Sequence, residues 1–307
     1  MIISRTEFPQ PAILLGNGLN NHVFTNTSWT NLLNQLTDDV IPRSYFNHDD
    51  LSYPEFFDAL SFNSRKGFED YESLKNKVCK RIIRWEGTPQ HHKFTEFVRE
   101  NNIPVVTTNF DLTLIDHKMR DAMKMKSGNP YKYLKPRQGG KVEGKTKFTD
   151  YYPWNTYYSD NVIENAPSQF AIWHMHGIAC YKRSLAIGAI DYGNNISRYK
   201  SYIGNQKEIC APEWNGKNTW LDIFFHCDLV IIGLSLNSQE TNLRWLLMER
   251  EKYFRKYQLF RKNTVFVTNK KLDSVGEGKK YFLNSIGIKV VEKVNGKEIY
   301  DEWGLID

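Results

Sequence analysis

The stretch VVTTNFD at residues 105–111 decides the fold that the sequence predicts. It joins a short apolar run, typical of a buried strand, to the polar residues Thr108, Asn109 and Asp111 at the end of that run. In open α/β sheets, ligands bind in the crevice at the carboxyl ends of the parallel strands. We therefore expect a strand at residues 105–108 whose tip faces a ligand.

Three other stretches have the same form: AILLGNG at residues 12–18, FAIWHMHG at residues 170–177 and DLVIIGLS at residues 228–235. Each is an apolar run of strand length that ends in Gly, Asn, His or Ser. Helical patterns separate them, and strands that alternate with helices are the signature of a parallel sheet. The sequence thus predicts an α/β fold, a Rossmann-like doubly wound parallel sheet, with one nucleotide site assembled from four strand tips.

Apolar spacing and capping residues predict the remaining elements. Ser28 and Thr88 are the expected N-caps of two helices. Further strands are expected at residues 264–267 and 289–291. Helices are expected at residues 29–36, 54–62, 71–85 and 89–99, from Asp111 onward, from residue 238 or 239 to about 257, and at 279–285.

Residues 127–167 differ from the rest of the chain, because they are rich in Lys, Gly and Tyr. We interpret them as a helical or irregular insertion, partly strand or loop, in a single domain that covers residues 1–307. The insertion is a candidate contact surface for a partner. A plain surface elaboration is an equally open interpretation, since long insertions cost little stability.

The composition is that of a globular protein, with 307 residues, 40% hydrophobic residues and 14% aromatic residues. No apolar run approaches the length of a membrane-spanning helix, and the first residues lack the apolar core of a signal peptide. The four scattered cysteines form no C-x-x-C pair, which excludes a common structural zinc pattern and suits a reducing cytosol. We therefore expect a cytoplasmic protein without a bound metal. The cysteines are Cys79, Cys180, Cys210 and Cys227.

The formal net charge is +6 and the sequence pI is near 8.9. Such a balance is compatible with an acidic partner, either a dinucleotide or a nucleic acid. Because Lys and Arg are spread along the chain, we expect mainly a solvated basic surface.

The strand tips carry groups that suit a nucleotide. The glycines of Gly16-Asn17-Gly18, directly after a strand, let the backbone approach a pyrophosphate closely. Asn21 stands where the G-x-G-x-x-G motif has its third glycine. An ordinary tight turn is therefore the alternative interpretation. Asn109 or Asp111 can orient a ribose or a water, or simply cap a helix.

The two later tips leave similar alternatives open. His174 and His176 share one face of a strand, but no neighbouring ligand completes a metal set. A histidine there is suited to general-base chemistry, or is a packed core residue. Gly233 and Ser235 end the most hydrophobic strand, and Asn269 lies near an adenosine ribose or in a plain turn.

In this order, the motifs resemble the sirtuin-like NAD-binding family. Residues 16–20 are similar to its Gly-Ala-Gly-x-Ser turn, and residues 108–111 to its Gln-Asn-x-Asp element. His176-Gly177 matches its His-Gly, and residues 233–236 match its Gly-Thr-Ser-Leu. The segment GLSLNSQETNLRWLL is especially similar to the bacterial sirtuin-like NADase domains of anti-phage systems.

Departures from the family narrow the function that the resemblance implies. The four-cysteine zinc module of the deacylases is absent, Asn20 replaces the family's Ser, and no Gly-Ile-Pro-Asp-Phe-Arg segment follows. These losses argue against protein deacylation and favour hydrolysis of NAD⁺ itself.

The resemblance therefore implies an NAD⁺ glycohydrolase that releases nicotinamide and ADP-ribose, with NAD⁺ as substrate. Asn109 would hold the ribose and position water, His176 would be general base or ribose-hydroxyl partner, and Asp111 would support that network. Gly16, Gly18 and Ser235 would contact the pyrophosphate. The remaining residues expected to bind NAD⁺ are Asn17, Asn20, Thr108, Gly233 and Asn269.

Such an enzyme would be an NAD-depleting effector of anti-phage defence, and its toxic activity would have to be inhibited until it is needed. We expect a separate regulatory or sensor subunit, or control by homo- or hetero-oligomerisation. The competing interpretations are a non-catalytic NAD or ADP-ribose-binding regulatory subunit, a protein deacylase or ADP-ribosyltransferase, and a nucleic-acid-binding protein motivated by charge alone.

Overall fold

The computed structural model describes residues 1–24, 26–40, 51–63, 71–115, 134–136, 156–160, 163–180, 182–269 and 276–306. Within these residues the main sheet has eight strands, in the spatial order β4-β5-β6-β3-β2-β7-β8-β9. The strands are β2 (Pro11–Leu15), β3 (Val105–Thr107), β4 (Leu134–Pro136), β5 (Thr156–Tyr158), β6 (Ile172–His174), β7 (Asp228–Ile232), β8 (Thr264–Thr268) and β9 (Lys289–Glu292). A separate parallel pair joins β1 (Ile2–Ser4) to β10 (Gly304–Ile306).

The six strands from β6 to β9 are parallel, and the two outer strands β4 and β5 are antiparallel to their neighbours. From the central β2, the chain adds β3, then β4 and β5 at the far edge, then β6 between β5 and β3. It then returns to add β7, β8 and β9 on the other side of β2. The order of strands therefore reverses beside β2. This reversal is the topological switch point at which open α/β sheets form a ligand crevice.

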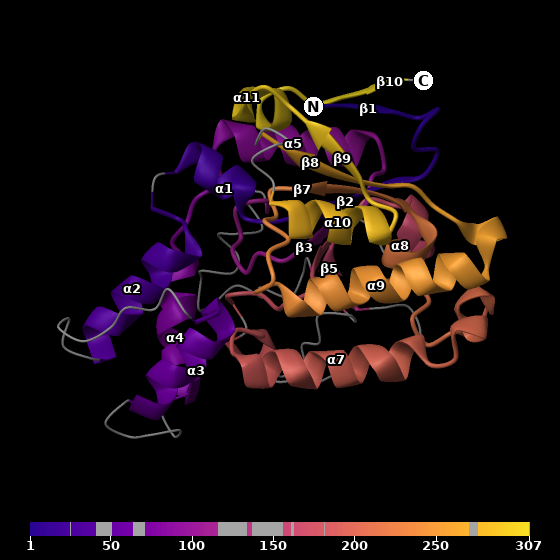
Figure 1. Ribbon diagram of the computed structural model, residues 1–307. Helices are drawn as coiled ribbons and strands as arrows, with labels where there is room; N and C mark the ends of the chain where they lie inside the picture. Colours follow the sequence, from indigo (N-terminus) through magenta and orange to yellow (C-terminus); the bar gives the residue numbers. More distant parts are fainter. Residues whose placement is uncertain are drawn as a thin grey trace.

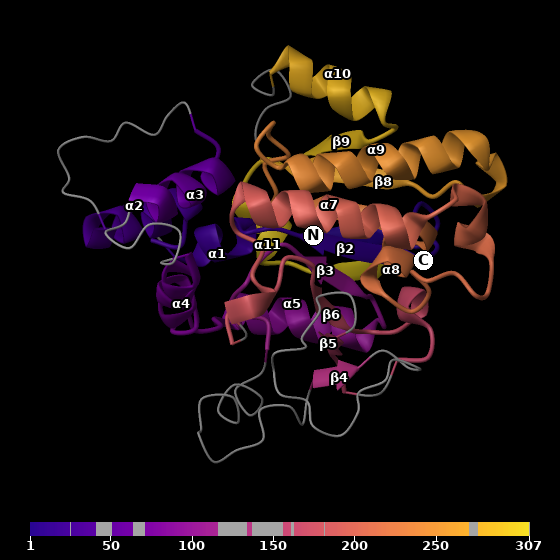
Figure 2. The same ribbon diagram turned by 90° about the horizontal axis from the view of Figure 1, so that it is seen from below.

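The helices are α1 (Gly18–Val23), α2 (Trp29–Val40), α3 (Tyr53–Asn63), α4 (Tyr71–Ile82), α5 (Pro89–Glu100), α7 (Ala189–Ile203), α8 (Trp220–His226), α9 (Thr241–Lys256), α10 (Glu277–Ser285) and α11 (Gly296–Tyr300). They cover both faces of the sheet, with α5 and α11 on one face and α7, α9 and α10 on the other (Figure 1). Seen from below, α7 and α9 lie side by side across the sheet (Figure 2).

The central strands are buried on both faces. Leu14, Val106 and Ile231 pack into the apolar cluster that includes α8 and α9, whereas Ile13 and Val230 pack into the cluster that includes α5. Strands covered on both faces read as continuous apolar runs, which is why the sequence signal was strong.

A third apolar cluster joins the helices α2, α3 and α4 into a unit beside the sheet (Figure 1). This cluster includes Phe110 from the loop after β3, and Leu185 and Ile187 from the segment that follows β6. The helical unit therefore covers the loops at the carboxyl ends of those two strands.

The structure confirms the predicted α/β class, the six parallel strands and most of the predicted helices, with shifts of a few residues at their ends. Ser28 Oγ accepts from the Asn31 amide at 3.1 Å, and Thr88 forms a capping box with His91, as their positions predicted. The helix expected from Asp111 is wrong for residues 111–115, which form a bend and a turn. The reason is local: Asp111 Oδ1 accepts from the Thr113 amide at 2.9 Å and also from the Thr113 hydroxyl, which fixes a turn.

Most of the predicted insertion, residues 127–167, lies outside the described residues. Its described parts include β4 and β5, which extend the sheet beyond β6. None of the described helices is long and apolar enough to cross a membrane. In the part of the chain that is described, the four cysteines are unpaired and no three potential metal-binding side chains cluster.

Candidate functional site

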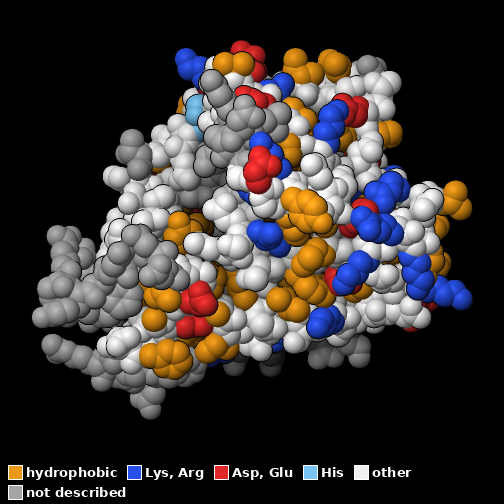
Figure 3. Space-filling view, viewed as in Figure 1, with side chains coloured by type: hydrophobic (Ala, Val, Ile, Leu, Met, Phe, Trp, Pro, Cys, Tyr) orange, Lys and Arg blue, Asp and Glu red, His pale blue; other side chains and the backbone are white. Residues whose placement is uncertain are grey.

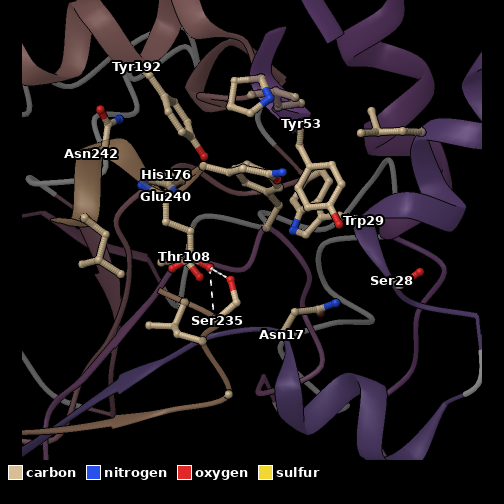
Figure 4. Close-up of a pocket in the computed structure, with 18 of the residues that line it drawn as sticks. Asn17, Ser28, Trp29, Tyr53, Thr108, His176, Tyr192, Ser235, Glu240 and Asn242 are labelled. Carbon is tan, nitrogen blue, oxygen red and sulfur yellow. Dashed lines mark hydrogen bonds between the residues drawn. The ribbon is translucent and has the colours of Figure 1, made fainter. Parts of the chain in front are cut away.

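An open cavity of about 230 Å³ lies at the carboxyl edge of the sheet, beside the switch point. Its lining comes from both the strand tips and the helical unit (Figure 4). The sequence-predicted residues in this lining are Asn17, Thr108, His176, Gly233 and Ser235. Residues that the sequence did not single out complete it, among them Trp29 and Tyr53 of the helical unit, Tyr192 of α7, and Glu240 and Asn242 around the start of α9.

The other predicted residues lie elsewhere. Asn109 and Asp111 line a small adjoining cavity of about 10 Å³, which shares Asn17, Trp29 and Phe110 with the main one. Asn109 and His176 therefore line neighbouring cavities separated by shared wall residues. The remaining predicted residues, Gly16, Gly18, Asn20 and Asn269, line neither cavity.

Asn109 connects two strand tips. Its side chain is 7% exposed, and its Nδ2 donates to the Gly16 carbonyl oxygen at 3.2 Å. Its backbone amide donates to Thr107 Oγ1 at 3.1 Å. The amide side chain thus holds the end of β3 against the end of β2, and its Oδ1 makes no hydrogen bond to the described residues.

Asp111 and Asn20 belong to a buried polar network. Asn20 Nδ2 donates to Asp111 Oδ2 and to Asn17 Oδ1, both at 2.8 Å. His91 Nδ1 accepts from the Thr88 amide, so the ring proton lies on Nε2, which donates to Asn20 Oδ1 at 2.8 Å. Burial lowers the pKa of His91 to about 4, which keeps the ring neutral. These bonds fix α1 and α5 to the loop after β3.

The glycines of the first tip pack against the tip of β7. The Gly16 amide donates to the Ile232 carbonyl at 2.8 Å, and the Gly18 amide donates to the Gly233 carbonyl at 2.9 Å. A Cβ on Gly18 would lie 2.4 Å from the Gly233 Cα. Close contact between two backbones therefore requires glycine here, independently of any ligand, and both amides are already used.

His174 and His176 have different surroundings. His174 is 1% exposed, and its Nε2 donates to the Asp111 carbonyl at 3.1 Å, so it packs inside the protein. His176 lines the main cavity, and its ring lies against that of Tyr192 with 5.3 Å between centroids. Its Nε2 is buried without a hydrogen-bond partner in the described structure. Burial lowers the pKa of His176 to about 4, so its imidazole is neutral at neutral pH and has a lone pair available.

Asn242 is the second buried polar side chain without partners at this cavity. It is fully buried, and neither its Oδ1 nor its Nδ2 has a hydrogen-bond partner among the described residues. Buried polar groups are normally hydrogen-bonded, so two such residues around one cavity indicate an occupant, either ordered water or a ligand. Sequence reasoning missed Asn242 because its position in the apolar pattern of α9 reads as a plain core helix.

The surface charge is mixed on the face that Figure 3 shows. Lys and Arg side chains are interspersed with Asp and Glu, and apolar side chains lie between them (Figure 3). On this face, the arrangement fits a solvated basic surface better than a continuous nucleic-acid-binding surface.

No family model matches the chain, and the comparison with curated proteins finds no match.

Proposed function

We propose that this protein is an NAD⁺ glycohydrolase that releases nicotinamide and ADP-ribose. The observation that carries the proposal is the neutral His176 imidazole, whose unpartnered Nε2 is buried at a cavity beside the switch point. A nucleotide is the ligand class that such crevices commonly hold. A neutral imidazole can accept the proton of an attacking water.

In the proposed reaction, water adds to the ribose carbon as the bond from that carbon to the nicotinamide nitrogen breaks. The electron pair of that bond leaves with nicotinamide and cancels its positive charge. His176 takes the proton released by water, so the products are nicotinamide, ADP-ribose and a proton. Apolar wall residues such as Trp29, Phe110 and Leu243 favour the neutral leaving group over the charged ground state.

The other predicted residues have assigned roles in this proposal. Asn109 would offer its Oδ1 to the ribose, and Asp111 would support it by fixing the loop. Ser235 would contact the pyrophosphate. Asn269, which lines neither cavity, is assigned to the adenosine ribose by the resemblance alone. We further propose that the protein is an NAD-depleting effector in a bacterial cytoplasm, controlled by a partner subunit or by oligomerisation.

A second candidate function is binding of NAD⁺ or ADP-ribose without cleavage. One observation favours it: Asn109, the residue expected to position the water, lies outside the main cavity. A regulatory subunit needs the crevice but not a positioned water.

Nicotinamide release separates these candidates. Purified protein, alone and with co-expressed neighbouring proteins, is incubated with NAD⁺, and nicotinamide is quantified by chromatography. Hydrolysis predicts release by the wild type and a loss of about 10²–10⁴ in rate for His176→Ala. His92→Ala, on α5 and away from the cavity, is the control. Full activity of a folded His176→Ala protein would contradict the mechanism, and binding without release under every condition would favour the regulatory function.

A further inference from the structure

The loop after β7 binds a carboxylate of its own chain. Glu240 Oε1 accepts from the Ser235 amide at 3.2 Å and from Ser235 Oγ at 2.6 Å. Glu240 Oε2 accepts from the Leu236 amide at 3.0 Å. Figure 4 shows the carboxylate and the Ser235 hydroxyl facing each other at the cavity. Three donors on two consecutive residues thus hold both oxygens of one anion.

A positive charge reinforces this anion site. Lys279 Nζ donates to the Ser235 carbonyl oxygen, and the charge of Lys279 acts favourably on the Glu240 carboxylate. Two backbone amides, a hydroxyl and a nearby ammonium are groups that bind phosphate oxygens in proteins. The site is therefore suited to a phosphate as well as to a carboxylate.

The same site belongs to the cavity that holds the unpartnered polar groups. Ser235 and Glu240 line it together with His176 and Asn242. His176 Nε2 and both polar atoms of Asn242 are buried and unpaired in the described structure. These groups indicate a ligand independently of the Glu240 contact.

We propose that Glu240 is a built-in competitor for the anionic part of the ligand. A phosphate or diphosphate group takes the three donors that the Glu240 carboxylate occupies in the free protein. The inference rests on the proposed function only for the choice of a dinucleotide as ligand.

Displacement of the carboxylate leaves the backbone hydrogen bond at the start of α9 in place. Glu240 precedes α9, and its backbone carbonyl, not its side chain, accepts the Arg244 amide at 3.0 Å. The side chain can therefore rotate while the helix stays intact. Burial raises the pKa of Glu240, because its carboxylate is partly removed from water where it lies. Movement into solvent restores that hydration and offsets the lost hydrogen bonds.

Occupation of the anion site by Glu240 weakens the apparent affinity for the ligand. When only a fraction of molecules has the anion site open, the apparent dissociation constant is raised by the inverse of that fraction. Glu240 thus sets how much phosphate-bearing ligand is needed to fill the cavity.

The test is calorimetric titration of the full chain with ADP-ribose, which cannot release nicotinamide. Glu240→Ala removes the competitor, and Glu240→Asp keeps the charge but is one methylene too short to reach both amides. We expect both variants to bind about tenfold more tightly than the wild type, the gain for a site that is open about a tenth of the time. The matched control is Glu249→Gln, a charge change on α9 outside the cavity, where Glu249 pairs with Lys252 at 2.6 Å. Its affinity is expected to equal that of the wild type.

Unchanged or weaker binding by folded Glu240 variants would overturn the inference, as would absence of ADP-ribose binding in every variant. Tighter binding by Glu240→Ala with wild-type affinity in Glu240→Asp would also overturn it, because loss of charge alone would then explain the gain. Nicotinamide release is measured separately. Tighter binding without release, also in the presence of the neighbouring proteins, leaves the inference intact and contradicts hydrolysis. Release with unchanged affinity in the Glu240 variants contradicts the inference and supports hydrolysis.

Discussion

The Asn20 side chain donates to the Asp111 carboxylate at 2.8 Å, so two residues that the sequence assigned to the ligand site are bonded to each other. Both are nearly fully buried, at 1% and 4% exposure. Their contact joins the helix α1 to the loop after β3. Asp111, which belongs to a motif that resembles an NAD-binding element, therefore stabilises the fold.

The substitution Asp111→Asn tests this stabilising role. The substitution places an NH₂ group opposite the Asn20 donor and leaves buried groups unpaired, so we expect a loss of about 1–3 kcal/mol in the free energy of unfolding. Urea denaturation with an unchanged slope measures it. A variant as stable as the wild type that has lost nicotinamide release would show that Asp111 acts on the substrate instead.

The neutral histidines predict a stability that depends on pH. The folded pKa of His91 is lowered to about 4 from the ordinary 6.5, so the unfolded chain binds the proton more readily. Stability attributed to neutral His91 is thus present above pH 6.5 and is lost as pH falls from 6.5 toward 4, by up to roughly 1.4 kcal/mol per unit. His174 and His176 shift in the same direction.

His91→Gln isolates this contribution, because its amide can still donate to Asn20 but does not titrate. Unfolding free energies are measured for both proteins at several pH values between 7 and 4.5. The difference between wild type and variant should shrink or reverse on acidification. A difference that stays constant would mean that His91 is protonated normally in the folded protein.

Two glycines make a matched pair for backbone packing. Gly18→Ala would place its Cβ 2.4 Å from the Gly233 Cα, so we expect a destabilisation of about 1–3 kcal/mol from overpacking. Gly193 lies in the helix α7, and a Cβ added there would have no other atom within 4 Å. Gly193→Ala should therefore stabilise the protein by about 0.5–1 kcal/mol. Thermal unfolding of both variants gives the comparison. Equal effects would argue against close contact between the β2 and β7 tips.

Tyr192 is expected to hold the His176 ring in place. Its ring lies against that imidazole, so Tyr192→Phe should keep most of the nicotinamide release, while Tyr192→Ala should lower it by about tenfold or more. The pH profile of kcat should shift in the alanine variant, because a better-solvated His176 regains a higher pKa. Loss of activity in Tyr192→Phe would show that the hydroxyl, rather than the ring, matters.

The sequence predicted the sheet and the gathering of strand tips because buried parallel strands have a strong apolar signal. It did not predict that Trp29 and Tyr192 would face the tips, because their positions depend on how separate helices pack. It could not distinguish Asn20 as a network residue from Asn20 as a ligand residue, since only tertiary contacts reveal His91 beside it. The prediction of a helix from Asp111 was wrong, because the Asp111 side chain accepts a hydrogen bond from the Thr113 amide and fixes a turn.

The most direct test of the central claim is a crystal structure of the His176→Ala protein with NAD⁺, because that variant should bind without turnover. We expect NAD⁺ at the carboxyl edge of the sheet, with its phosphates on the Ser235 and Leu236 amides and its nicotinamide ribose beside residue 176. NAD⁺ bound at another surface, or a cavity that stays empty at saturating NAD⁺, would contradict it.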